Sequence, residues 1–290
     1  MKYPRIVEAV FNTPWAIMPD KLDAIIEFIG IKASGFDVQA MPEAMQHTTE
    51  SPSGQVQVIP VHGVISHRIH MVNNISGAGG TSTELLGMQI DRAVNDPSVT
   101  TIVLDIDSPG GSVAGVQEVA EKIYQARESK PIIAVANSMA ASAAYWIGSA
   151  ASEFVITPSG MAGSIGVLTA HTDVSKFEEN EGFKTTMISA GKYKVEGNQF
   201  EPLSDEATQS IQSVIDSYYE EFASTVARNR GASLSDVKNG YGEGRALTAK
   251  DALIAGLVDT IETMDQVLSR VTKTAPSRRM NAEIDLLEIQ

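Results

Sequence analysis

The stretch TTIVLDIDSPGGS, residues 100–112, decides the fold class. Residues 100–106 are mostly β-branched or apolar, which is typical of a strand covered on both faces. Two glycines, Gly110 and Gly111, follow this strand and precede a predicted helix over 113–127. A buried strand that turns directly into a helix predicts an α/β domain.

Strands and helices alternate on both sides of this stretch. We expect strands at 56–61, 131–136 and 153–156, helices at 83–95 and 141–151, and a loop rich in Gly, Ser and Asn over 73–82. Such alternation implies right-handed βαβ crossovers and a mostly parallel sheet.

A long helix is predicted after residue 204. Ser204 is its expected N-cap, and Gly231 is its expected end. Its apolar residues recur on one face, which favours packing of the whole stripe against the core. They are Ile211, Val214, Ile215, Tyr218, Phe222 and Val226.

The main domain is expected to span residues 55–271. Residues 1–54 are predicted to be an N-terminal helical arm, with apolar periodicity over 17–31, and a linker rich in turn formers over 33–54. Residues 272–290 are predicted to form a C-terminal tail.

Composition excludes several functional classes. The formal net charge of −14 disfavours nucleic acid and anionic membranes as partners. The chain has no cysteine, which removes disulfides, thiolate nucleophiles and Cys-based zinc sites. No apolar run is long enough to span a bilayer, and the N-terminus lacks a signal-peptide core, so we expect a cytoplasmic protein.

The glycine pair at the end of the decisive strand has the geometry of an anion or oxyanion site. Glycines let backbone N–H groups approach a ligand closely, and a helix N-terminus favours negative charge. The segment matches neither a P-loop nor a dinucleotide-binding fingerprint. A tight strand-to-helix turn without a ligand is an equally good interpretation of the glycines alone.

A candidate nucleophile lies further along the chain. Ser142 follows the predicted strand 131–136 within a run of small residues, which leaves room for an extended substrate. An alanine-rich helix packed on the sheet is the simpler alternative. The five histidines form no recognisable triad motif, and His67 with His70 is better explained as a solvated loop pair than as half a metal site.

A lysine can replace histidine as the base when burial lowers its pKa. Lys192 and Lys194 lie in a loop after the predicted strand 183–188. Most lysines are solvated surface charges, so neither is assigned from its position alone.

Five segments, taken in order, resemble the signal peptide peptidase A family of Ser/Lys proteases, and in particular its phage branch, the lambda-type head maturation (capsid assembly) proteases. The resemblance covers roughly residues 55–270. The segments are residues 107–111, 141–145, 163–166, 191–194 with 200–204, and 244–252 with 256–259. The chain departs from the family where Ala143 and Ala144 replace a glycine pair.

The resemblance implies a ClpP/crotonase-like spiral of βαβ units and a serine endopeptidase. It implies Ser142 as nucleophile, Lys194 as base, Ser164 as the residue that orients the lysine, and Gly110 and Gly111 as the oxyanion hole. No cofactor or metal is implied. The expected partners are a polypeptide substrate, such as capsid scaffold, portal or coat protein, and further copies of the chain in a homo-oligomeric ring.

Three alternatives stay open. A cytoplasmic bacterial protease resembling signal peptide peptidase would share the mechanism and differ in its biological role. A crotonase-type acyl-CoA enzyme would share the fold and the oxyanion site. A non-catalytic assembly protein would keep the fold for oligomerisation only. The phage role places the protein in the host cytoplasm or within the procapsid.

Overall fold

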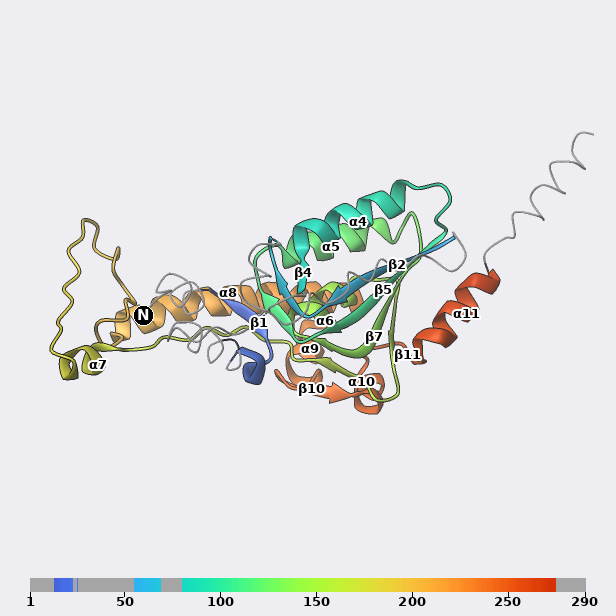
Figure 1. Ribbon diagram of the computed structural model, residues 1–290. Coiled ribbons are helices and arrows are strands. Elements are labelled where there is room, and N and C mark those ends of the chain that lie inside the picture. The colour runs from blue at the N-terminus through green and yellow to red at the C-terminus, as the bar shows by residue number, and fades with distance from the viewer. Residues whose placement is uncertain (1–12, 23–24, 26–54, 69–79, 275–290) are drawn as a thin grey trace, which may run out of the picture.

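A computed structural model describes residues 13–22, 25, 55–68 and 80–274 of the chain. Within these residues, a seven-stranded mixed sheet and a four-stranded sheet are packed with helices (Figure 1). The predicted α/β class with parallel βαβ units is therefore confirmed. The predicted helix 17–31 lies mostly outside the described residues, and the linker 33–54 lies entirely outside them.

The main sheet is centred on two long parallel strands, β5 (Thr101–Ser108) and β7 (Ile132–Ala141). β2 runs parallel to β5. The first half of β7 pairs with β8 and its second half pairs with β9, both in parallel. β10 then joins β9 in the antiparallel sense, and β11 joins β8. The bounds are β2 (Val56–His62), β8 (Glu153–Ile156), β9 (Met161–Gly163), β10 (Ala246–Thr248) and β11 (Thr260–Ile261).

Alternating strand residues face two apolar layers. Ile102, Leu104 and Ile106 belong to the larger core, which contains residues of α4 (Thr83–Asn95), α5 (Val116–Ala126) and α6 (Ala143–Ser149). Val103 and Val135 face the other way, toward Val267 and Val271 of α11 (Met264–Thr274). The period of two in a strand thus buries both faces of the sheet, as the sequence of the decisive strand predicted.

A long helix, α8 (Asp205–Arg230), begins and ends as predicted. The Ser204 side chain accepts a hydrogen bond from Ala207 N–H, and Gly231 ends the helix in the left-handed conformation. The prediction that the whole apolar stripe packs in the core is wrong. Phe222 and Val226 are buried, whereas Val214 and Tyr218 are 47% and 39% exposed. The first half of α8 extends beyond the sheet (Figure 1), so its apolar residues are not covered by the core that the sheet forms.

Smaller helices complete the chain. They are α7 (Ser175–Asn180), α9 (Leu234–Gly240) and α10 (Ala249–Ala255). Figure 1 shows that α7 and the loop after it project away from the main sheet, alongside the first turns of α8. None of the helices within the described part of the chain is long and apolar enough to cross a membrane.

The four-stranded sheet lies at the carboxyl end of β5. Its order is β1 (Trp15–Ile17), β6 (Gly110–Ser112), β3 (Val64–Ser66) and β4 (Gly80–Ser82). The glycine pair predicted as a turn before a helix therefore lies in a short strand, with neighbours on both sides. This strand brings the N-terminal segment to the end of the main sheet.

Candidate active site

Ser142 occupies a strained turn between β7 and α6. Its φ of 55° lies in the left-handed region, which residues other than glycine rarely adopt. Its N–H donates to the Gly163 carbonyl at 2.7 Å, and its carbonyl accepts from Trp146 N–H at 2.9 Å. These two bonds hold the serine where the strand turns into the helix, a position in which strain is commonly retained for function.

The Ser142 hydroxyl faces the loop after β9. Its Oγ donates to the Gly166 carbonyl over 3.4 Å, and the whole residue is buried. The residues next to it in the chain are small. Ala140, Ala141 and Ala143 are all alanines and all buried. Small side chains around a buried hydroxyl leave room for an extended peptide to place its carbonyl group next to that hydroxyl.

The glycine loop lies beside Ser142. A methyl group built on Gly110, which has a φ of 99°, would lie 3.0 Å from Ser142 Cβ. Gly110 N–H donates to Ser108 Oγ at 3.2 Å, and Gly111 lies opposite Ala16 in the β1–β6 ladder. A methyl group on Gly111 would lie 1.8 Å from the Ile65 carbonyl oxygen, so only glycine fits at this position.

Ser164 lies on the other side of the site. Its φ is 53°, and its N–H donates to the Arg245 carbonyl at 2.9 Å. That bond connects β9 to the segment 244–252, one of the five segments that carried the resemblance. Among the described residues, the nearly buried Ser164 hydroxyl has no hydrogen-bond partner.

The two candidate lysines differ in their surroundings. Lys192 Nζ lies 2.9 Å from Glu206 and 2.7 Å from the Tyr193 hydroxyl. These bonds raise the Lys192 pKa, with Tyr193 the larger cause, and so favour its protonated form. Lys194 is exposed on the projecting loop, and its ammonium group has no hydrogen bond or ion pair with the described residues.

Within one chain, the structure brings together three of the four predicted elements of the site. Ser142, the Gly110–Gly111 pair and Ser164 meet at the carboxyl ends of β5, β7 and β9. Lys194 is not among the contacts of this site. Gly166, the last residue of the predicted segment 163–166, contributes its carbonyl to the site. Ala16 also lies there, although the sequence did not indicate it.

The described histidines are bonded elsewhere. His62 Nε2 lies 3.1 Å from Asp105, His67 Nδ1 lies 3.2 Å from Thr83 Oγ1, and His171 Nε2 lies 3.1 Å from the Asn198 carbonyl. The hydrogen bond to Asp105 raises the pKa of His62. None of these bonds engages Ser142. His70 lies outside the described residues.

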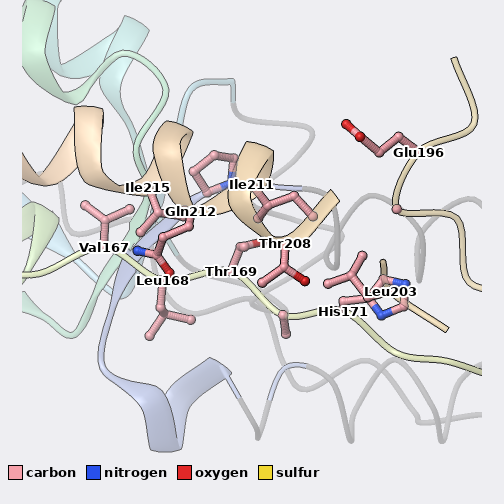
Figure 2. A pocket seen from close by; sticks show the side chains of 13 residues that line it. Val167, Leu168, Thr169, His171, Glu196, Leu203, Thr208, Ile211, Gln212 and Ile215 are labelled. Atoms are coloured by element: carbon pink, nitrogen blue, oxygen red, sulfur yellow. The ribbon is translucent and has the colours of Figure 1, made fainter. Parts of the chain in front are cut away.

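A groove runs along α8, lined by the segment that follows Gly166. It has a volume of about 460 Å³. Figure 2 shows Ile211 and Ile215 of α8 opposite Val167, Leu168 and Thr169 of the extended segment after β9. Two of the six stripe residues that were predicted to be core, Ile211 and Ile215, thus line a cavity.

Comparison with known families decides the classification. The model of peptidase family S49 matches residues 124–277, which include Ser142, Ser164 and Lys194. The chain belongs to peptidase family S49. The resemblance inferred from five ordered segments is thereby confirmed.

Curated relatives of this S49 chain include phage proteins. Capsid assembly protease C of Escherichia phage lambda is 33% identical over 77% of the chain and 50% of its own length. The head-tail preconnector protein GP5 of Enterobacteria phage P21 is 35% identical over 74% of the chain and 42% of its own length. A putative protease of Methanocaldococcus jannaschii is 30% identical over 64% of the chain and 60% of its own length. The chain therefore spans about half the length of these relatives.

Among solved structures, the alignment with a membrane-bound stomatin-specific protease covers 74% of this S49 chain and 83% of the protease chain. The sequence identity is 15% and the TM-score is 0.45.

Proposed function

We propose that the chain is a serine endopeptidase in which Ser142 is the nucleophile and Lys194 of a neighbouring copy is the base. The observation that carries this proposal is the strained, buried Ser142 beside the Gly110–Gly111 loop. An activated hydroxyl next to backbone N–H donors is the arrangement that acyl transfer requires.

The chemistry follows from these groups. The neutral Lys194 amine takes the proton of Ser142 Oγ, and the oxygen attacks the carbonyl carbon of a peptide bond. Gly111 N–H stabilises the oxyanion. Gly110 N–H, which the resemblance implies as a second donor, is bonded to Ser108 Oγ at 3.2 Å, so Gly110 contributes through the close approach that its missing side chain allows. The lysine returns the proton to the leaving amine, and water then hydrolyses the acyl-enzyme ester with the lysine again as base. Ser164 Oγ orients the amine.

A lysine from a second copy fits the surroundings of both residues. Lys194 has no charged or hydrogen-bonding partner within the described part of its own chain, and the Ser164 hydroxyl that would receive it is also unpaired. A heterologous contact repeated around a ring gives each Ser142 the lysine of its neighbour. Each protomer is then incomplete on its own.

The projecting loop has the surface expected of such a contact. Figure 1 shows that this loop projects beside the first turns of α8. Apolar side chains are exposed along the loop, and others are exposed on α8. Patches of this kind mark interaction sites in soluble proteins. The residues are Phe177, Phe183, Met187, Ile188 and Tyr193 on the segment 175–200, with Val214 and Tyr218 on α8.

The names of the phage relatives support a substrate among head proteins. We propose that capsid scaffold, portal or coat protein is cleaved during procapsid maturation, in the host cytoplasm or inside the procapsid. The alternative is a protease with a role in the cell, which the similarity to a putative archaeal protease supports. The buried alanines around Ser142 favour small side chains next to the scissile bond.

A mixing experiment tests the dyad. Ser142→Ala and Lys194→Ala are each expected to lower cleavage of unfolded casein and of scaffold protein by at least about 10³-fold. An equal mixture, reassembled from dissociated protomers, should recover about a quarter of wild-type activity, because that fraction of ring contacts joins an intact serine to an intact lysine.

Lys192→Ala is the matched control and should keep its activity, since Lys192 is held by Glu206. A mixture that stays inactive although both variants assemble would exclude a dyad shared between copies. Full activity of Ser142→Ala would exclude the proposed nucleophile.

A further inference from the structure

Strand β1 lies between two segments of the candidate site. On one side it pairs with β6 in the antiparallel sense, with Trp15 opposite Ser112 and Ile17 opposite Gly110. On the other side Trp15 exchanges two hydrogen bonds with Leu168, each 2.8 Å long. The N-terminal segment is thus an extended strand with a partner along both edges, which is how proteins bind an added peptide strand.

The register places Ala16 at the glycine loop. Val113 N–H donates to the Pro14 carbonyl, and Met18 N–H donates to the Pro109 carbonyl. Hydrogen-bonded pairs alternate in an antiparallel ladder, so the intervening pair, Ala16 and Gly111, is also of the hydrogen-bonded class.

The Ala16 carbonyl is also close to the nucleophile. A methyl group built on Gly110 would lie 2.2 Å from the Ala16 oxygen and 3.0 Å from Ser142 Cβ. The Ala16 oxygen, Gly110 and Ser142 are therefore immediate neighbours. A substrate carbonyl about to be attacked needs the same surroundings.

The sizes of the β1 side chains suit a peptide bound beside Ser142. Ala16 is fully buried and joins the main core, whereas Trp15 and Ile17 point to a separate apolar cluster with Leu22 and Ile25. Pro14 lines the groove along α8. A small residue thus lies beside the buried serine, with larger residues on either side of it.

We propose that residues 14–18 are a built-in substrate, which fills a peptide groove between β6 and Leu168 and presents the Ala16–Ile17 peptide bond to Ser142. This peptide groove is not the cavity along α8, which only Pro14 of these residues lines. This inference rests on the proposed function. Ser142 Oγ bonds to the Ala16 carbonyl carbon, the bond from that carbon to Ile17 N breaks, and the new amine takes the proton that the lysine removed from Ser142. Water hydrolyses the ester and leaves a chain that begins at Ile17.

The arrangement couples activity to assembly. Without the lysine of a second copy, β1 stays intact and excludes other polypeptides from the groove. Cleavage separates Ala16 from Ile17, so β1 is no longer one continuous strand. The first peptide bond that each site cleaves is then the one in the chain's own N-terminal segment.

Cleavage itself is followed by intact-mass spectrometry and N-terminal sequencing of the assembled full chain. Wild type should accumulate a product that begins at Ile17, and Ser142→Ala should not. Wild type that cuts casein but keeps residues 1–16 attached would overturn the self-cleavage while leaving the proposed function intact.

Occupancy of the groove is tested without catalysis, in the Ser142→Ala background. A fluorescent peptide with the sequence of residues 13–20 is titrated against a variant that releases β1, Ile17→Asp. Val271→Asp is the matched control, because it buries the same charge under α11, away from the site. Release of β1 should strengthen peptide binding by at least about tenfold over the control, since only the open groove can bind.

A second variant locks β1 in place and does not release it. When the antiparallel register of the Trp15–Leu168 bridge is extended by one residue, Ala16 faces Val167. The Cα atoms of such a non-hydrogen-bonded pair are usually about 4.5 Å apart, which suits a disulfide. Because the chain has no cysteine, Ala16→Cys with Val167→Cys introduces the only thiols. The oxidised pair should bind no peptide, and dithiothreitol should restore binding.

These binding results decide the occupancy even if no polypeptide is ever cut. Tighter binding on release of β1, and loss of binding on locking it, support the occupied groove. Two results would overturn the occupancy of the groove by β1. One is equal peptide binding by Ile17→Asp and Val271→Asp, and the other is peptide binding that is the same with the disulfide oxidised or reduced.

Discussion

The indole of Trp146 stacks on the ring of Phe222, with centroids 4.5 Å apart and planes inclined by 6°. Trp146 lies one turn after Ser142 and donates its backbone N–H to the Ser142 carbonyl. The stack therefore connects the helix that begins after the candidate nucleophile to the buried half of α8. Stability and the position of the nucleophile depend on the same contact.

Truncation of this contact should be costly. Phe222 is fully buried, so Phe222→Ala is expected to lower the free energy of unfolding by about 3–5 kcal/mol. Thermal and denaturant unfolding measure the loss. Ile254→Ala, on the exposed face of α10, is the control and should stay within about 0.5 kcal/mol of wild type. Similar effects of the two substitutions would contradict the role given to the stack.

Two buried serines in the glycine loop provide a matched pair. Ser108 Oγ donates to the Gly63 carbonyl at 2.6 Å and accepts from Gly110 N–H at 3.2 Å. Ser112 Oγ is also buried and has no hydrogen-bond partner among the residues that the structure describes. Ser108→Ala should cost about 1–3 kcal/mol, because it leaves buried groups unpaired, while Ser112→Ala should be neutral or stabilising.

The same pair also tests the loop in catalysis. Because Ser108 fixes Gly110 beside Ser142, Ser108→Ala should lower kcat with little change in KM, and Ser112→Ala should leave both constants near wild type. The peptide-cleavage assay measures both. Equal kcat values for the two variants would show that this hydrogen bond does not hold the loop in its active geometry.

The sequence predicted the loops of the site better than the boundaries of the elements around them. Ser142 and the glycine pair follow parallel strands, and the carboxyl ends of such strands meet at one edge of a sheet. The strand predicted to end at residue 136 continues to Ala141, because its last residues pair with β9. That pairing is non-local and leaves no periodic signal in the strand itself.

Two further features depend on tertiary context. The first half of the α8 stripe is as apolar as the second, and only the end of the sheet decides which half is buried. Residues 15–17 are too few to give a strand signal, yet both edges of β1 are paired. The separation of Lys194 from the described contacts of the site could not be predicted either, since the spacing of segments along the chain does not fix their positions in space.

Low pH should weaken one specific ion pair. Arg230 donates to both carboxylate oxygens of Asp259, at 3.0 and 2.6 Å, and Phe154 N–H donates to the same carboxylate. Burial raises the Asp259 pKa, but the bonds from Arg230 and Phe154 outweigh it and hold the pKa below its ordinary value. Stability from this group is therefore complete above the unfolded pKa of about 3.9 and is lost as pH falls through the lower folded pKa.

The substitution that tests this pair is Asp259→Asn. It should lower the free energy of unfolding by about 1.5–3 kcal/mol at neutral pH, and the difference from wild type should shrink below about pH 4. Denaturant unfolding at a series of pH values measures it. Glu128→Gln, whose side chain is exposed, should show no such trend. A difference that stays constant down to pH 2 would show that the carboxylate charge is not what stabilises the fold.

The projecting loop offers the sharpest test of assembly. Ile188 is 95% exposed, so a charge placed there costs the isolated protomer almost nothing but is buried if a second copy covers the patch. Ile188→Lys should weaken self-association by at least about tenfold, while the melting temperature of the protomer stays the same. Glu179→Lys, exposed on α7 in the same segment, is the matched control for added positive charge. Analytical ultracentrifugation over a concentration series compares them. If both variants and wild type sediment alike at every concentration, the exposed apolar residues do not join protomers, and the proposed dyad shared between copies loses its contact surface.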